Sequence, residues 1–394
     1  SAAASAQEGG ELLANGGFEE EGAGEEGGLP AGWSLVEGAR SGDSDRASSV
    51  RLAPEGDPSG KCAVLSGSDN THVWRVLAQE IEVEPGKTLR VSGRMRTADV
   101  RPSGSQFANS NLVVIFEGDR PLGVRATAPR LGTRSWETVA LRTEVPAGAR
   151  RARIGCFLSS SGTAWFDDLS ARYVEPPRWE KRSGELYDMY WLDPDRVTED
   201  DLVANEAACR EAASFLGVAP AARIAFYKYA SSAAKEEFIG DPGNAHVARD
   251  KMEIHSLFAR DRHEIVHLLA REIGNPPAIL GEGLAVHLAG PWHGKTNRAW
   301  TGEFLADGRY VVLPEILDTR SFRAGDDLVT YPECGAFVEF LVETHGWPRV
   351  RALYGAARAD GSAEDFRKAF RDSLGVSFEE SEARFREWAA AGKK

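Results

Sequence analysis

Residues 261–270 read Asp-Arg-His-Glu-Ile-Val-His-Leu-Leu-Ala and place two histidines four positions apart. Residues with this spacing lie on the same face of an α-helix, and the apolar residues here also recur with helical spacing. Asp261, with a glutamate three positions later, resembles a capping box. Gly-Asn-Pro-Pro at residues 274–277 is a typical helix stop. The segment is therefore predicted as a helix that presents His263 and His267 on one face.

Two imidazoles arranged in this way can bind one metal ion. His263 and His267 supply ring nitrogens, which suit zinc. Glu264 is offset by one residue, so it can reach a water molecule at the open position of the metal and act as general base. A second helix, predicted over about residues 277–289, carries Glu282 as the third ligand. The alternative is a surface helix with two unrelated histidines.

Two further segments carry a resemblance to a known family. Residues 280–285 read Leu-Gly-Glu-Gly-Leu-Ala, and residues 331–341 read Tyr-Pro-Glu-Cys-Gly-Ala-Phe-Val-Glu-Phe-Leu. Together with His-Glu-x-x-His, they resemble the gluzincin metallopeptidases, specifically the compact peptidase MA-like family. The resemblance covers roughly residues 187–390. It implies an α+β domain that hydrolyses peptide bonds, with zinc held by the two histidines and Glu282.

The same resemblance implies roles for a tyrosine and a strand. Related aminopeptidases use a tyrosine downstream of the third ligand, so Tyr331 is expected to stabilise the substrate oxyanion. Its alternative is a core aromatic at a helix start, and Tyr310 and His255 are weaker candidates for the same role. Residues 252–258 are predicted as a strand. It is either an edge strand that pairs with an extended substrate or an ordinary buried strand.

The N-terminal half has a different pattern. From about residue 11 to residue 174, short alternating runs separated by turn signals predict a β-sandwich. Asn-Gly-Gly-Phe-Glu at residues 15–19 and Trp-Phe-Asp-Asp-Leu at residues 165–169 resemble the jelly-roll carbohydrate-binding modules of bacterial glycoside hydrolases. That resemblance implies a structural calcium held by Glu19 and Asp168. The alternative is two unrelated surface acids.

Sugar binding by this half requires exposed aromatic side chains. The available aromatic residues are Trp33, Trp74, Phe107 and Trp136. Trp33 and Trp136 lie in segments that resemble scaffold motifs and are expected in the core. No particular sugar is predicted.

The predicted organisation is multidomain, with an all-β jelly-roll sandwich followed by an α+β gluzincin-like domain. Residues 1–10 are expected to be disordered, and residues 11–174 form the sandwich. Residues 175–186, stiffened by two prolines, are expected to be a linker. Residues 187–394 form the zinc metallopeptidase-like domain.

Composition excludes some classes of partner. The formal net charge is −13, and without a basic cluster the chain is a poor partner for nucleic acid. No stretch is long and apolar enough to span a bilayer. The small, polar start at residues 1–7 resembles the end left by signal-peptide removal, so a secreted, periplasmic or cell-surface protein is expected. The cysteines allow two disulfides or four buried thiols, at Cys62, Cys156, Cys209 and Cys334.

Three functions are compatible with this sequence. The first is a secreted zinc metallopeptidase that cuts peptides with Glu264 as base, the sandwich serving as a targeting module for a glycan or cell-surface polymer. The second is a non-catalytic glycan-binding protein with a decayed peptidase-like domain. The third is a structural surface protein that keeps metal only for stability. Retention of Glu264, which a structural site does not need, favours the first.

Overall fold

The computed structural model describes residues 9–22, 29–39, 49–58, 60–67, 73–101, 110–159, 161–192, 196–248 and 250–392. Most of the N-terminal segment predicted to be disordered lies outside these ranges. The chain divides into two compact units. The first comprises Ser1–Arg178 and Ala230–Gly243, and the second comprises Trp179–Tyr229 and Asn244–Lys394.

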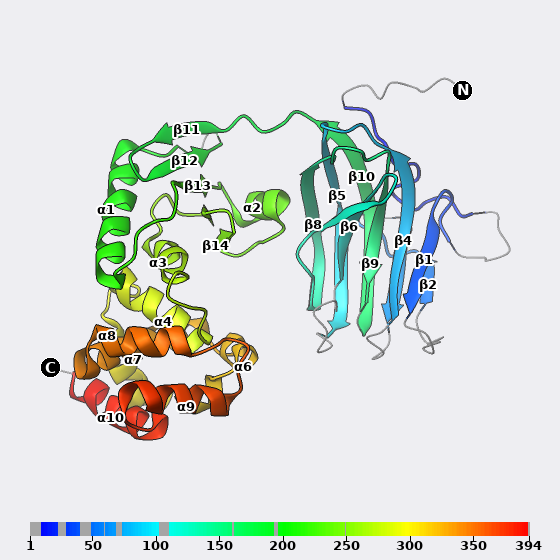
Figure 1. The fold of residues 1–394 in the computed structure, drawn as a ribbon. Helices are drawn as coiled ribbons and strands as arrows, with labels where there is room; N and C mark the ends of the chain where they lie inside the picture. The colour runs from blue at the N-terminus through cyan, green and yellow to red at the C-terminus, as the bar shows by residue number, and fades with distance from the viewer. Residues whose placement is uncertain are drawn as a thin grey trace. The chain divides into compact units, whose positions relative to one another are not determined.

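The first unit is built on two five-stranded antiparallel sheets (Figure 1), with strand orders β1-β4-β9-β6-β7 and β2-β3-β10-β5-β8. Side chains from both sheets join in one hydrophobic core, so the prediction of a β-sandwich is confirmed. The strands are β1 (Ser34–Ala39), β2 (Ser49–Ala53), β3 (Cys62–Gly67), β4 (Val73–Glu82), β5 (Thr88–Val100), β6 (Ser110–Glu117), β7 (Pro121–Ala126), β8 (Gly132–Glu144), β9 (Arg151–Leu158) and β10 (Gly162–Val174).

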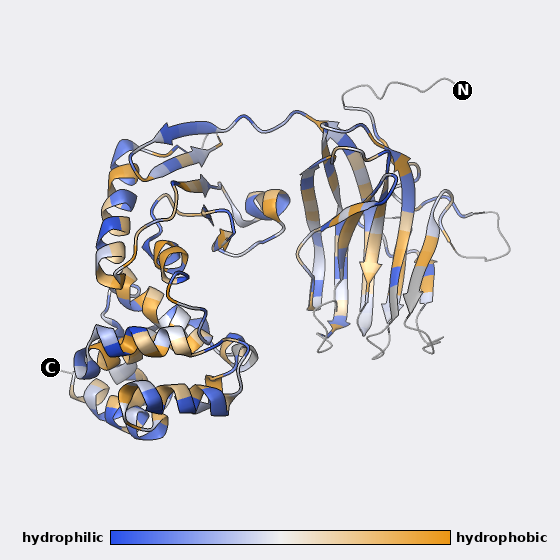
Figure 2. Ribbon diagram, viewed as in Figure 1, coloured by the Kyte–Doolittle hydropathy of each residue, from blue (hydrophilic) through white to orange (hydrophobic). Residues whose placement is uncertain are grey.

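Alternation along the strands explains why this half forms a sandwich. In β5, buried and partly exposed residues alternate over most of the strand, and Leu89, Val91 and Met95 face the core. Figure 2 shows the same change of hydropathy from residue to residue in the neighbouring strands. Successive strand side chains point to opposite faces, so such a strand buries one face and leaves the other polar.

A helix from a later part of the sequence completes the first unit. Helix α2 (Ser232–Ile239) packs against β8, and Glu236 forms two hydrogen bonds of 2.8 Å with the Arg130 guanidinium. Beside it, Glu237 pairs with Arg90 and Arg142. This packing was not predicted from the sequence, because it joins residues more than a hundred positions apart.

The second unit contains a five-stranded sheet of order β11-β12-β13-β15-β14. The three central strands are parallel, and the two outer ones are antiparallel to their neighbours. Strand β11 lies inside the predicted linker, residues 175–186; its residues are polar and mostly exposed at the sheet edge. The strands are β11 (Glu180–Ser183), β12 (Tyr187–Trp191), β13 (Ile224–Lys228), β14 (Ala245–Ala248) and β15 (Glu253–Ser256).

Helices make up the rest of the second unit (Figure 1), which agrees with the predicted α+β class. None of the helices within the described residues is both long and apolar enough to cross a membrane. The four cysteines are buried free thiols. The helices are α1 (Glu199–Leu216), α3 (Arg262–Ala270), α4 (Ala278–Ala289), α5 (Asn297–Asp307), the 3-10 turn η1 (Leu313–Ile316), α6 (Thr319–Ala324), α7 (Asp327–His345), α8 (Trp347–Ala356), α9 (Ala363–Leu374) and α10 (Phe378–Ala391).

The ion pair between Arg130 and Glu236 gives the first prediction. Their side chains are only 5% and 8% exposed, so Glu236→Ala leaves a buried guanidinium with too few partners. We expect the variant to lose about 3 kcal/mol or more of unfolding free energy, measured by urea denaturation. The exposed Glu80→Ala, which breaks pairs with Arg151 and Arg153, is the control and should cost about 1 kcal/mol or less. Equal losses in both variants would contradict a buried ion pair at α2.

Candidate metal centre

Asp261 fixes the start of α3 and ties it to the sheet. Its carboxylate accepts a hydrogen bond from the backbone N–H of Glu264 at 3.2 Å. It also accepts one from the hydroxyl of Ser256, the last residue of β15, at 2.6 Å. Because the cap joins β15 to α3, the first turn of the helix, which carries His263, has a defined position. The helix therefore begins where the sequence predicted.

Glycine at position 283 lets α4 and α7 approach closely. A Cβ atom at Gly283 would lie 2.6 Å from the backbone oxygen of Cys334 on α7. A Cβ atom at Gly335 would lie 2.5 Å from Val286 on α4. Both contacts are shorter than side chains allow, so only glycine fits where the two helices meet. The Glu-Gly pair at residues 282–283 thus combines a candidate ligand with the packing residue that holds its helix in place.

The two helices bring three donor atoms together. His263 Nε2 and His267 Nε2 lie 3.1 and 3.0 Å from Glu282 Oε2, and the two nitrogens lie 3.0 Å apart. Within the described part of the chain, these residues form the one group of His, Cys, Asp or Glu with metal-binding geometry. Zinc with bonds of about 2.0–2.1 Å holds its tetrahedral ligand atoms about 3.3 Å apart. The donor set and its spacing therefore fit zinc.

Hydrogen bonds alone cannot satisfy all three of these donor atoms at once. If both imidazoles donate from Nε2 to Glu282, two N–H groups face each other across 3.0 Å. If one Nε2 is deprotonated, one of the contacts to the carboxylate joins two acceptors. A cation at the centre satisfies all three atoms at once.

Electrostatics keep the Glu282 carboxyl ionised. Burial raises its pKa, but the hydrogen bonds from His263 and His267 outweigh burial and hold the pKa well below the usual range. An ionised carboxylate is the form that ligates zinc. The local environment thus prepares Glu282 for metal binding.

Tyr331 and Glu264 lie at the same centre. The Tyr331 ring centroid is 6.3 Å from that of His263, with the rings inclined at 32°. Burial raises the pKa of Tyr331, and the charges of Glu282, Asp327 and Glu264 raise it further. The phenol therefore stays protonated and can donate a hydrogen bond. Tyr331 is half-buried beside the site and also packs against the hydrophobic core of the second unit, so its role as oxyanion donor stays a prediction.

The weaker oxyanion candidates have other partners. The Tyr310 hydroxyl donates to Glu382 at 3.0 Å. His255 Nδ1 lies 2.9 Å from the hydroxyl of Tyr229. The strand that carries His255, β15, lies between β13 and β14, so it is an internal strand of the sheet. The edge next to β15 is formed by β14, a strand that was not predicted from the sequence.

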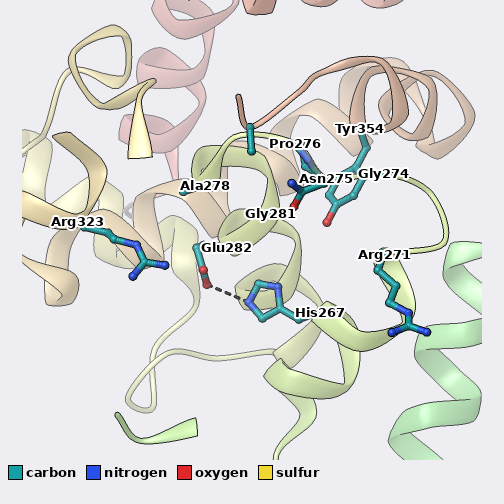
Figure 3. Close-up of a pocket in the computed structure, with 11 residues that line it drawn as sticks. His267, Arg271, Gly274, Asn275, Pro276, Ala278, Gly281, Glu282, Arg323 and Tyr354 are labelled. Atoms are coloured by element: carbon teal, nitrogen blue, oxygen red, sulfur yellow. Dashed lines mark hydrogen bonds and ion pairs between the residues drawn. The ribbon is translucent and has the colours of Figure 1, made fainter. Parts of the chain in front are cut away.

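Two residues at the centre were missed by sequence reasoning. The indole of Trp292 stacks on Tyr331, with ring centroids 5.7 Å apart. Arg323 on α6 lies close enough for its charge to lower the pKa of Tyr331. Figure 3 shows its guanidinium pointing toward the Glu282 carboxylate. Neither residue belongs to a recognisable motif, although the Gly-Pro-Trp turn directly after α4 marks Trp292 as close in sequence to Glu282.

The predicted calcium site in the sandwich contains a third acid. Glu19 Oε1 accepts the backbone N–H of Lys61 at 3.0 Å, and Asp168 is an exposed residue with φ of 47°. Asp167, the neighbour of Asp168 in the sequence, is buried. Burial raises the pKa of Asp167 to about 6, and the charges of Asp168 and Glu19 add to the shift. The charges of Glu19 and Asp168 thus both reach Asp167. These acids are not among the described groups with metal-binding geometry, and calcium binding stays a prediction.

Of the aromatic residues considered for sugar binding, the structure describes the side chains of Trp33 and Trp136. Trp33 is buried, and its indole donates to the backbone oxygen of Asn15. Trp136 is partly buried and packs against a small hydrophobic cluster. Phe107 and the Trp74 side chain lie outside the described residues. Sugar binding also stays a prediction.

Comparisons with known proteins concern less than half of the chain. No protein-family model matches the sequence, and curated proteins give no match. The enzymatically active domain of bacteriophage CBA120 tailspike protein 4 is similar over 42% of this chain and 21% of its own length (19% identity, TM-score 0.31). The CBM22-1 xylan-binding domain from Paenibacillus barcinonensis Xyn10C is similar over 44% and 99% (17% identity, TM-score 0.30). A family 16 carbohydrate-binding module is similar over 42% and 99% (14% identity, TM-score 0.30).

The helix that carries Tyr331 also holds a buried acid. Glu333 is fully buried on α7, and its carboxylate accepts the backbone N–H of Val311 at 3.2 Å. Burial raises the pKa of Glu333 to about 8, and the charge of Glu382 adds to the shift. The folded protein therefore holds this proton more tightly than the unfolded chain does.

The proton on Glu333 makes the free energy of unfolding depend on pH. Its contribution is complete below about pH 4.5, the ordinary value for glutamate, and is lost as the pH rises through about 8. We expect Glu333→Gln to be more stable than the wild type at pH 9 and to show a flatter melting temperature between pH 5 and 9, measured by circular dichroism. The exposed Glu364→Gln should behave like the wild type. A Glu333→Gln variant with an unchanged pH profile would show that Glu333 is not protonated in the fold.

Proposed function

We propose that this protein is a secreted zinc-dependent peptidase whose second unit carries the active site. The observation that supports it most is the convergence of His263, His267 and Glu282 within 3.1 Å, with Tyr331 beside them. Three protein ligands that leave one position open are typical of catalytic zinc, whereas structural zinc is closed by four. Zinc, when bound there, makes water a nucleophile at neutral pH and polarises a carbonyl group.

Glu264 is the general base of the proposed reaction. It follows His263 directly on α3 and is half-buried, so its carboxylate lies next to the ligand set without belonging to it. Its charge reaches Tyr331 across the site. Glu264 accepts a proton from the attacking water and later delivers it to the leaving amine.

Tyr331 stabilises the charge that develops on the substrate carbonyl. Because its pKa is raised, the phenol remains a hydrogen-bond donor across the physiological pH range. Stacking against Trp292 and contact with Phe322 restrict the ring. A donor held in place before the reaction costs no reorganisation when the oxyanion forms.

Strand β14 offers a place for an extended peptide. It is one of the two edge strands of the sheet, the other being β11, and it packs against α3, the helix of the two histidines. One side of β14 pairs with β15, and the other side can bind a peptide backbone by strand addition. Binding through main-chain groups requires little side-chain specificity, so a peptide is the proposed substrate class. The sandwich serves as a binding module for a glycan or cell-surface polymer.

The test compares the wild type with Glu264→Gln and Tyr331→Phe, using a broad peptide library and zinc analysis of each protein. We expect bound zinc in all three. Cleavage should fall at least about 100-fold in Glu264→Gln, because the base is lost. In Tyr331→Phe, kcat should fall about 100-fold or more, because an oxyanion donor is lost. Circular dichroism spectra should be unchanged.

Two outcomes would contradict the proposal. Zinc in every variant without cleavage by the wild type favours the alternative, a non-catalytic glycan-binding or structural surface protein. Equal cleavage by wild type and Glu264→Gln would show that another site is responsible. The exposed variant Glu364→Gln is the control for changes unrelated to the site.

A further inference from the structure

A pocket of about 160 Å³ opens directly beside the candidate metal centre. His267 and Glu282 form one wall, and Asn275 and Tyr354 lie on another side (Figure 3). At Gly281 a Cβ atom would meet nothing within 4 Å, so this position leaves the pocket open. A group placed in the pocket would therefore lie next to the atoms that bind the metal.

Positively charged residues outnumber negatively charged ones around this pocket. Arg271 and Arg323 line it, and Glu282, a candidate metal ligand, is its one acidic residue. The guanidinium of Arg271 points away from Glu282 in Figure 3, and its Nε lies 3.3 Å from Glu272. Arg323 instead points toward the Glu282 carboxylate. The cation directed at the site is therefore Arg323.

Arg323 is one of several exposed arginines of the second unit, together with Arg349 and Arg371, that form no ion pair within the described residues, and it is the one of these that lines the pocket. Arg309, Arg358 and Arg384 each pair with a nearby carboxylate at 2.6–2.9 Å. For Arg323, no ion pair is found with any carboxylate of the described residues, although the chain carries a net charge of −13. A guanidinium matches a carboxylate with two parallel hydrogen bonds. With no carboxylate partner among the described residues, Arg323 can bind an external anion.

We propose that Arg323 binds a carboxylate of the substrate in this pocket, so that the protein prefers peptides with an acidic side chain or a free C-terminus next to the metal centre. The inference rests on the proposed peptidase function, because it uses the same site. Arg323 is then a specificity residue. Its side chain holds the substrate carboxylate while Glu264 and Tyr331 act on the peptide bond.

Binding is measured by isothermal titration calorimetry on the full-length, zinc-loaded Glu264→Gln protein, which does not cut the bound peptide. One pair of peptides is acetyl-tetra-alanine with a free or an amidated C-terminus. A second, amidated pair has glutamate or glutamine at the centre of a penta-alanine sequence. Each is tested with Arg323 intact, with Arg323→Ala and with Arg323→Lys. The exposed Arg384→Ala is the matched control.

We expect at least one carboxylate peptide to bind about tenfold or more tightly than its neutral partner, as for hydrogen bonds to a charged group. Arg323→Ala should abolish the preference, Arg323→Lys should keep part of it, and Arg384→Ala should keep all of it. A preference in the first pair identifies the C-terminus as the recognised group, and one in the second identifies the side chain. Both support the inference.

The inference is overturned if neither pair shows a preference, or if the preference survives Arg323→Ala, since the carboxylate would then bind the metal directly. Failure of the peptidase proposal gives a different result. In that case the wild type cuts no peptide, while Arg323-dependent carboxylate binding persists. Conversely, cleavage of peptides irrespective of charge would leave the peptidase proposal intact and remove the role of Arg323.

Discussion

The packing of α4, which carries Glu282, against both α3 and α7 is the constraint on which the candidate site depends. Two ligand atoms come from one face of α3, but the third comes from α4, after a loop of prolines and a change of direction. The close contact of α4 with α7 at Gly283 holds Glu282 against the histidines. The same contact fixes the position of α7, which carries Tyr331 close to its N-terminus. The packing of α4 against α7 therefore positions both the candidate ligand Glu282 and the proposed oxyanion donor Tyr331.

Charge explains why these three residues suit a cation. Glu282 is ionised and partly shielded from water between two imidazoles. A partly buried carboxylate is stable only where positive charge or hydrogen bonds compensate for lost hydration. The histidines supply hydrogen bonds, but their nitrogens also approach each other. A divalent cation bound among these three atoms would remove this conflict.

The sequence predicted those parts of the fold that depend on local interactions. The capped helix from Asp261, the helix after Pro277 and the alternation in the sandwich strands are all local patterns, and all are present. Glu282 was predicted from a resemblance, because sequence spacing alone does not show that α4 folds back on α3.

The parts that the sequence did not reveal depend on contacts between distant residues. Helix α2 packs on β8, and its Glu236 pairs with Arg130, more than a hundred residues away in the sequence. Strand β14 is short and weakly alternating, so nothing marked it as the sheet edge. Arg323 lies on a six-residue helix and enters the site only because α6 packs close to α4. Position, not residue type, gives these residues their roles.

The most direct test of a metal centre is X-ray absorption spectroscopy at the zinc edge on full-length protein loaded with one equivalent of zinc. The structure predicts two imidazole nitrogens and one carboxylate oxygen at about 2.0–2.1 Å, with one further light atom. Glu282→Gln should remove the carboxylate oxygen from this shell. A protein that retains no zinc, or a spectrum dominated by sulfur or by six oxygens, would contradict the account.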